Sequence, residues 1–314
     1  MNELAIMRAR RCLSLFLALI AGGCHEGAQK PSATTDATRP RSVISSDTTE
    51  RPVGSRTIDT MPSIDSLAVL AKRYPPSATA PTSRLNVTPG SSLIDVSQLH
   101  PYHRTYTIFS YACEPTTGEP PTRSGEYTDE LTLLGDSAIL RVETWHRGTD
   151  PEVRDSTILN GRTLALHSSV GHSDHWSDLW IVRNGKASFW SSDMNVPPSQ
   201  TVDTIIGEPA FGGTIEILLG LTPRAYPGDV SVSYRALGLL THPGDTPEIT
   251  VSDLAVRTVD TATAQPLGGP ARPVWVVAAD DGATFWIDRE NRTPLGWDVP
   301  QDESICEQKY VLRL

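Results

Sequence analysis

The sequence predicts a mainly β protein, in which an antiparallel meander forms a curved sheet or half-barrel wrapped around one helix, preceded by a disordered tether. Three observations support this fold class. Short β-type runs separated by turn residues follow one another from about residue 100, one segment among them has helical spacing, and residues 26–62 lack a periodic apolar face. We therefore expect a leader over residues 1–23, a tether over residues 24–99 and a β-rich globular domain over residues 100–314.

The first 23 residues have the organisation of a signal peptide. Met1–Arg11 carries three arginines against one glutamate, and Cys12–Ala21 is apolar but shorter than the about 20 residues that cross a bilayer. The sequence Ala21-Gly22-Gly23-Cys24 resembles the lipobox of bacterial lipoproteins, although the usual first residue is Leu or Val. The resemblance implies cleavage before Cys24 and a lipid on its thiol, which anchors the chain in a membrane. An ordinary secretory signal is the alternative.

The residue after Cys24 bears on location. In lipoproteins of enteric bacteria an aspartate there tends to retain the protein in the inner membrane, and His25 stands there instead. We therefore expect a lipid-anchored protein of the outer membrane facing the periplasm, with the cell surface as the alternative.

Charge limits the choice of partners. The leader removes three arginines and one glutamate from the 27 basic and 37 acidic residues, which leaves a formal charge of −12. No basic stripe stands out, so nucleic acid is not an expected partner. The expected partners are the membrane, through the N-terminal lipid, and a lipid or another envelope protein.

The tether is rich in Ser, Thr, Pro and charged residues, a composition that cannot bury enough apolar surface to offset its ordering entropy. Ser63–Tyr74 interrupts it with an amphipathic pattern. Ser63 can cap a helix, basic residues fall in the last turn, and Pro75-Pro76 stops it. We expect a short helix near residues 63–74.

Hairpins account for most of the expected sheet. Asn-Gly and Asp-Gly pairs between β-type runs favour type I′ turns, because both central residues must adopt positive φ. Such pairs stand at Asn160-Gly161, Asn184-Gly185 and Asp281-Gly282, and Gly135-Asp136 marks another turn. We expect strands over the following runs: Arg104–Cys113, Tyr127–Leu134, Ser137–His146, Val153–Leu159, Thr163–Val170, Leu179–Arg183, Lys186–Trp190, Asp229–Arg235, Glu248–Arg257, Val274–Ala279, Ala283–Asp288, Leu295–Val299 and Ile305–Leu314.

One segment departs from the β pattern. Glu208–Leu221 places Phe211, Ile215, Leu218 and Leu219 near helical spacing, and prolines follow it. We expect a helix there, packed against the concave side of the sheet, despite the cost of two internal glycines.

The order of these elements resembles a known family. The segments Tyr226–Asp229, Trp275–Val277, Phe285–Arg289 and Thr293–Leu295 carry the resemblance, which covers Arg104 to the C-terminus. They resemble an uncharacterised family of bacterial periplasmic domains of unknown function, thought to be similar to the half-barrels of the outer-membrane lipoprotein carrier and receptor. The resemblance implies a half-barrel whose contents would be a lipid or acyl chain, and it implies no catalytic residues.

Two cysteines remain once the leader and Cys24 are accounted for. An even pair in an exported domain predicts a disulfide, here between Cys113 in the first expected strand and Cys306 in the last. Two separate free thiols are the alternative.

Evidence for chemistry is weak. His172, Asp174 and His175 are metal-ligand types, but their spacing fits no established zinc signature. No G-x-S-x-G elbow or H-E-x-x-H helix is present. Asp155, Asp280 and Asp281 are expected at or beside turns, where the backbone uses them. We therefore assign no catalytic residue and no cofactor, and favour a protein that is not an enzyme.

The tryptophans suggest a binding module. Inward aromatic residues of a half-barrel can line an apolar cavity, and seven tryptophans are many beside five phenylalanines. The leading hypothesis is a non-enzymatic envelope lipoprotein that binds an apolar ligand or another envelope component. A structural or protein-interaction module without a cavity, and an exported enzyme without a recognisable motif, are the alternatives. The candidate cavity residues are Phe211, Ile215, Leu218, Leu219, Trp275 and Trp286.

Overall fold

The computed structural model describes residues 83–112, 121–193, 196–222, 230–240, 247–300 and 305–314. The expected leader, the lipidated Cys24, the tether helix at residues 63–74 and Cys113 lie outside these ranges, as does the side chain of Cys306. The described elements have the following bounds: β1 Ser83–Val87, the 3-10 helix η1 Val96–Gln98, β2 Tyr102–Ala112, β3 Thr122–Leu134, β4 Ala138–His146, β5 Val153–Asn160, β6 Leu166–His172, β7 Trp176–Arg183, β8 Lys186–Asp193, β9 Val196–Ile205, α3 Ile215–Leu221, β10 Val230–Leu240, β11 Glu248–Ala264, β12 Arg272–Ala279, β13 Thr284–Asp288, β14 Pro294–Pro300 and β15 Ile305–Arg313.

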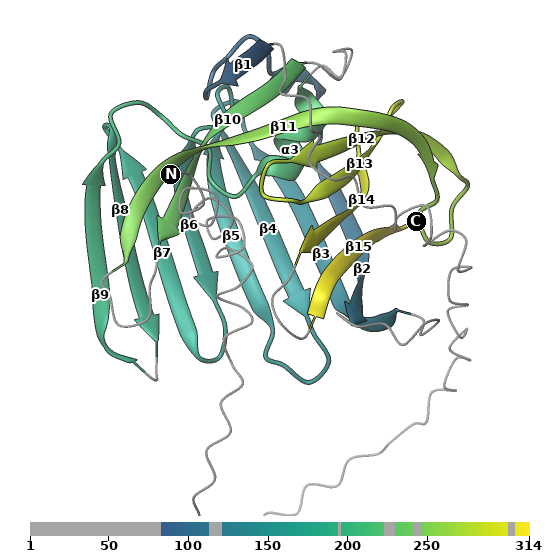
Figure 1. Ribbon diagram of the computed structural model, residues 1–314. Coiled ribbons are helices and arrows are strands. Elements are labelled where there is room, and N and C mark those ends of the chain that lie inside the picture. The colour runs from purple at the N-terminus through teal and green to yellow at the C-terminus, as the bar shows by residue number, and fades with distance from the viewer. Residues whose placement is uncertain (1–82, 113–120, 194–195, 223–229, 241–246, 301–304) are drawn as a thin grey trace, which may run out of the picture.

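All the strands join one sheet that curves around α3 without closing (Figure 1). The sheet consists of two antiparallel meanders, β2 to β9 and β10 to β15, which are joined where β15 pairs with β2. β1 pairs in parallel with β10 at one edge, and β9 forms the other. β11 arches across the molecule and contacts β9, so the two ends of the sheet approach each other. This architecture confirms the predicted fold class.

The turn signals mark the chain reversals, but only some set the loop length. Asn184 and Gly185 adopt φ of 52° and 72° and form the predicted two-residue turn between β7 and β8. The reversal at Asn160-Gly161 is a longer loop, because the Asn160 side chain accepts hydrogen bonds from the N–H groups of Arg162 and Thr163, both at 2.9 Å. Local side-chain bonding here replaces the tight hairpin.

The sheet begins earlier than the expected boundary at residue 100. β1 lies within the segment that the composition assigned to the tether, and its Val87 is 1% exposed. β1 is stabilised by parallel pairing with β10, about 150 residues away in the chain. Local composition carries no trace of such a distant partner, so the prediction for this stretch is wrong.

The helix α3 is shorter than the expected Glu208–Leu221. Phe211 instead forms a parallel bridge with Ala236, and its backbone N–H and C=O bond to β10 at 2.9 and 2.8 Å. The two glycines that follow favour helix poorly, so the helix starts only at Ile215. Neither α3 nor another helix of the described ranges is long and apolar enough to cross a membrane.

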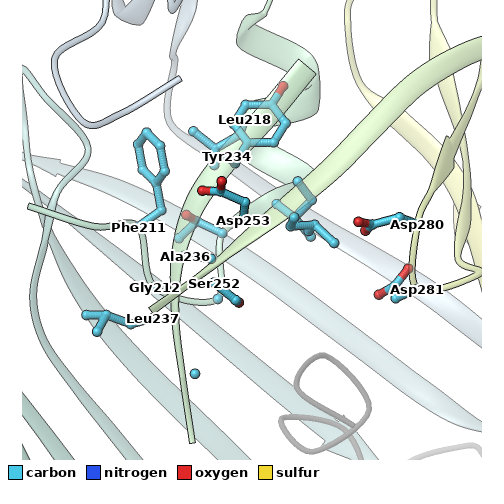
Figure 2. Close-up of a pocket in the computed structure, with 15 residues that line it drawn as sticks. Phe211, Gly212, Leu218, Tyr234, Ala236, Leu237, Ser252, Asp253, Asp280 and Asp281 are labelled. Atoms are coloured by element: carbon cyan, nitrogen blue, oxygen red, sulfur yellow. The ribbon is translucent and has the colours of Figure 1, made fainter. Parts of the chain in front are cut away.

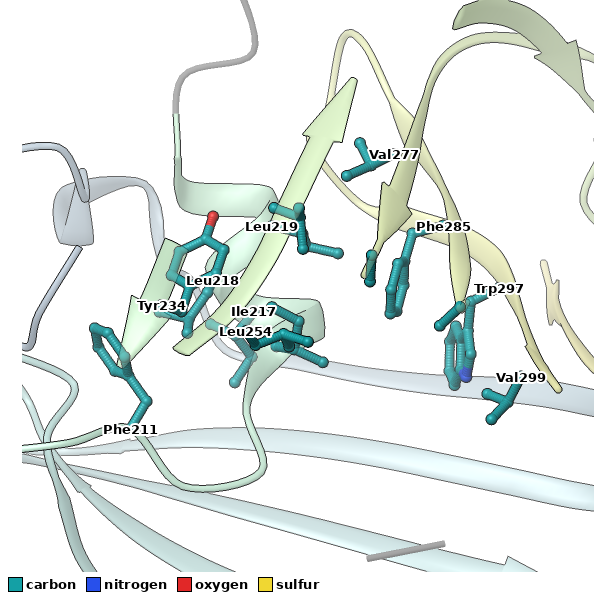
Figure 3. Packing of buried hydrophobic residues seen from close by; sticks show 14 of the residues in the cluster. Phe211, Ile217, Leu218, Leu219, Tyr234, Leu254, Val277, Phe285, Trp297 and Val299 are labelled. Atoms are coloured by element: carbon teal, nitrogen blue, oxygen red, sulfur yellow. The ribbon is translucent and has the colours of Figure 1, made fainter. Parts of the chain in front are cut away.

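The core forms where α3 meets the concave face of the sheet (Figure 3). Six of the seven helix residues are buried. Leu218 and Leu219 pack in the cluster that also contains Phe285 and Trp297 from β13 and β14. Gly220 allows this close approach, since a Cβ there would lie 2.6 Å from the carbonyl oxygen of Arg292. The helix is thus part of the core on the concave side of the sheet.

Candidate functional site

The inward face of β4 carries two charged side chains. Ile139, Arg141, Glu143 and Trp145 alternate along this strand and are all buried, with Arg141 0% exposed. Because alternate residues of a strand share a face, Arg141 and Glu143 point into the same interior as the apolar pair. Charged side chains are almost never fully buried unless they are paired, so we expect oppositely charged or hydrogen-bonding partners around Arg141.

Arg141 finds those partners on three elements. Its Nε and Nη2 donate to the two carboxylate oxygens of Asp129 on β3, at 2.9 and 3.1 Å. Nη1 donates to the carbonyl oxygen of Gly213 at 2.8 Å, and Nη2 to Glu216 of α3 at 3.3 Å. Nη2 also lies 3.2 Å from Oε1 of Glu143. A single guanidinium therefore fastens the helix to the wall of the sheet.

The network holds more acids than one arginine can neutralise. Burial raises the pKa of Glu143 to about 8, against the opposing effect of Arg141. Burial also raises the pKa of Glu216. The hydroxyl of Tyr127 donates to Oε1 of Glu143 at 2.6 Å. The raised pKa of Glu143 favours uptake of a proton by this carboxylate in the folded state. Perturbed carboxylates of this kind occur at functional sites and also in purely structural networks.

Strand register extends this network into an acidic row. Asp129, Glu143, Asp155, Gly171 and Asp178 lie directly opposite one another across β3 to β7. Burial, and then the neighbouring Asp178, raise the pKa of Asp155 to about 7. Gly171 leaves the room for this carboxylate, since a Cβ there would lie 2.5 Å from Oδ1 of Asp155. The expectation that Asp155 serves a turn is wrong, because it lies within β5 on the inward face.

A small pocket opens beside the start of α3 (Figure 2). Its volume is about 80 Å³, whereas sites for drug-sized ligands run from about 300 to 1,000 Å³. It is lined by residues of the segment before α3, of α3 itself, of β10 and β11, and of the β12–β13 turn. The lining residues are Phe211, Gly212, Gly213, Thr214, Ile215, Leu218, Tyr234, Ala236, Leu237, Gly238, Ser252, Asp253, Leu254, Asp280 and Asp281.

The candidate cavity residues are divided between this pocket and the core. Phe211, Ile215 and Leu218 line the pocket, and Leu219 is buried in the core. Trp275 and Trp286 are not among the lining residues. Trp286 pairs with Val276, the neighbour of Trp275, so the two tryptophans point to opposite faces of the β12–β13 hairpin. The two tryptophans therefore do not pair across the hairpin.

The weak metal candidates lie on the surface. His172 ends β6, and Asp174 and His175 follow in the connection to β7, all three exposed. Across the part of the chain that the structure describes, no group of three or more His, Cys, Asp or Glu side chains could hold a metal ion.

The outer face of β6 to β8 presents an apolar patch. Val170, Leu179 and Trp190 lie opposite one another on successive strands, and Ile181 follows Leu179 on the same face. Val170, Ile181 and Trp190 are 36–45% exposed. We call these four residues the outer patch. Contiguous exposed apolar side chains mark interaction surfaces more often than singly scattered ones do.

The interior network was not predicted from the sequence. The signal was present in Ser137–His146, where strict alternation puts Arg141 and Glu143 in phase with Ile139 and Trp145. Charged residues at the inward positions of a strand indicate a buried network, because their unpaired burial would be costly. Their partners on β3 and α3 could not be identified, since pairing and helix position are set by distant parts of the chain.

Comparisons with known proteins add little to this geometry. No protein-family model matches the chain, and no curated protein matches it. Among solved structures it is similar to a β-barrel-like protein of the domain of unknown function DUF1849 from Brucella abortus. That match has a TM-score of 0.43 and 14% sequence identity, and covers 68% of this chain and 95% of the other. The sheet itself defines the class: this is an open, β-barrel-like domain.

Proposed function

We propose that the protein is a lipid-anchored lipoprotein of the cell envelope, whose β-barrel-like domain is a non-enzymatic interaction module. The module recognises another envelope component at its surface and does not enclose a lipid. One observation carries this proposal: α3 is packed in the core against the concave face of the sheet, and the pocket beside its start has a volume of only about 80 Å³.

The interior is unsuited to an acyl chain in two respects. By analogy with the lipoprotein carrier and receptor, a lipid would lie between the sheet and the helix, where Leu218 and Leu219 are packed in the core instead. The wall opposite α3 carries Arg141, Asp129 and Glu143. An alkyl chain placed against these groups would separate them from their partners, and leaving buried charges unpaired costs roughly several kcal/mol of free energy. The geometry therefore favours recognition at the surface.

The anchor rests on the N-terminal sequence. Residues 1–23 supply the export signal and Cys24 the acceptor thiol. Labelling cells with a radioactive fatty acid tests this part of the proposal. We expect label on the wild-type protein and none on Cys24→Ala. A wild-type protein that takes up no label would be a soluble exported protein.

The outer patch is the surface that the proposal assigns to recognition. Placing a photo-crosslinking amino acid at Trp190 in intact cells should yield discrete adducts. The matched control is the same amino acid at Asp136, which is also exposed but lies in the β3–β4 turn away from the patch. Identical adduct patterns from the two positions would contradict recognition through this face.

A further inference from the structure

The pocket beside α3 has a distinctive chemical lining. One side is apolar, with Phe211 and Leu237, and the other carries the carboxylates of Asp280 and Asp281 (Figure 2). The remaining polar residues along it are Thr214, Ser252, Asp253 and Tyr234, and the hydroxyl of Tyr234 is hydrogen-bonded to that of Thr222 at 2.7 Å. No basic side chain is among its lining residues, all of which are described. The side chains thus offer acceptors with apolar contact, a poor environment for an anion.

Thr214 provides a second, independent indication that the pocket binds a hydrogen-bond donor. This residue is 3% exposed, lines the pocket, and its Oγ1 has no hydrogen-bond partner among the described residues. Although Thr214 is the residue before the helix, its hydroxyl does not cap the helix. Buried hydroxyls are nearly always hydrogen-bonded, because leaving one unsatisfied costs about 1–3 kcal/mol. A ligand donor in the pocket would remove this deficit.

The two carboxylates are held in place by backbone N–H groups of β11 and of the β12–β13 turn. Oδ1 of Asp280 accepts from the N–H of Ala255 at 3.3 Å, and Oδ1 of Asp281 from the N–H of Ala283 at 3.0 Å. These bonds agree with the expectation that the backbone uses both acids at the turn. They also fix the direction of each carboxylate before a ligand arrives. Burial raises the pKa of Asp281 to about 6, so it is mostly ionised at neutral pH.

We propose that this pocket binds a primary ammonium group carried on a short aliphatic chain, the chemistry shared by a lysine side chain and a short free amine. An ammonium group is a donor only, and it matches a lining of acceptors. Its alkyl chain would contact Phe211, Leu218 and Leu237. The inference deepens the proposed function and rests on it in one respect, namely that the amine belongs to another envelope component.

The size of the pocket fits such a group. Its about 80 Å³ is several times the about 10–15 Å³ that one water needs, and well below an ordinary ligand site. The end of a side chain fits, and a drug-sized molecule does not. Among the described residues, Arg84 is a basic group close to this lining, and its Nη2 lies 3.9 Å from Oδ2 of Asp253. Because both side chains are about half exposed, this pair competes only weakly with a bound ammonium.

The test uses the mature chain, residues 24–314, with Cys24→Ala so that no covalent acyl chain is present. n-Butylamine is titrated near neutral pH and followed by backbone amide NMR shifts, with 1-butanol and butyrate as neutral and anionic controls. A second arm replaces n-butylamine with N-acetyl-lysinamide. We expect saturable shifts at residues lining the pocket for the amine, and about tenfold weaker binding for both controls.

Three variants locate the site. Asp280→Asn combined with Asp281→Asn keeps the oxygens that accept from Ala255 and Ala283, so the fold should persist, and amine binding should fall about tenfold. Thr214→Val keeps the shape of the side chain and should weaken binding severalfold. Asp136→Asn, an exposed acid far from the pocket, should change nothing.

The outcomes separate the two proposals. Binding of N-acetyl-lysinamide as well as n-butylamine indicates a lysine on a protein partner, whereas binding of n-butylamine alone indicates a small amine. Equal binding of butanol and butylamine, or amine binding unaffected by the paired Asn substitutions, overturns this inference but leaves the surface-recognition proposal intact. Failure of the lipid or crosslinking tests leaves the pocket chemistry intact.

Discussion

Replacing Arg141 by methionine should strongly destabilise the fold, because this fully buried side chain holds the interior ion pairs together. Arg141→Met keeps a long apolar side chain but removes the donors to Asp129, Gly213 and Glu216. Three carboxylates then share a buried space without a cation. Breaking a buried ion pair by removing one partner costs about 3–5 kcal/mol, a large part of the about 5–15 kcal/mol that stabilises a typical domain.

Urea unfolding followed by tryptophan fluorescence measures this loss, with Arg183→Met on an exposed position as the matched control. The control should change the free energy of unfolding by less than about 0.5 kcal/mol. The deficit of Arg141→Met should also shrink as the pH is lowered. Without the cation the buried acids bind protons still more readily in the folded state, and protonation removes their repulsion. A loss below about 1 kcal/mol, or a deficit independent of pH, would refute the role assigned to Arg141.

Three further predictions concern the stability and covalent state of the domain. Glu143 has a pKa of about 8 in the folded state, against an ordinary value of 4.5. Between these two pH values the folded state binds one more proton than the unfolded state. As the pH rises, ionisation of Glu143 therefore destabilises the fold. The free energy of unfolding should therefore fall between about pH 5 and pH 9, and Glu143→Gln should flatten that fall; parallel curves for the two proteins would contradict the assignment. Leu219→Ala, at a position 0% exposed, should cost about 2–5 kcal/mol in urea unfolding, and a smaller loss would mean that α3 is loosely packed. The strand register sets Ile305 opposite Ala112, the last residue of β2. Cys306 follows Ile305 in the sequence and Cys113 follows Ala112, so the register is compatible with the expected disulfide. The exported protein should be lighter by two hydrogens before reduction, and two alkylatable thiols in unreduced, unfolded protein would count against the disulfide.

Local chemistry accounts for what could be predicted from the sequence. Alternation and turn residues mark most strands, and the pair Asn184-Gly185 sets its hairpin because both residues tolerate positive φ. β1 could not be found, since its stability comes from β10 far along the chain. The helix was placed too early because Phe211 pairs with β10 rather than continuing a helix.

The pocket also combines residues that local sequence can predict with residues that only distant contacts bring together. Phe211, Ile215 and Leu218 could be proposed from helical spacing, and they line the pocket. Asp280 and Asp281 lie at the pocket because the β12–β13 turn packs against β11, where the N–H of Asp280 donates to the carbonyl oxygen of Ala255 at 2.9 Å. No spacing within the sequence reveals that contact. The acidic row likewise depends on the register of five strands, which a single sequence leaves open.

The most direct test of surface recognition is a search for lipid inside the domain. Native mass spectrometry of the protein purified from the envelope would show the covalent anchor and any additional bound molecule. Because α3 is packed in the core and the pocket beside it is small, we predict a mass that the chain and its covalent lipid explain completely. A non-covalent acyl lipid retained at one per chain would contradict the account, because it would require the helix to leave the sheet.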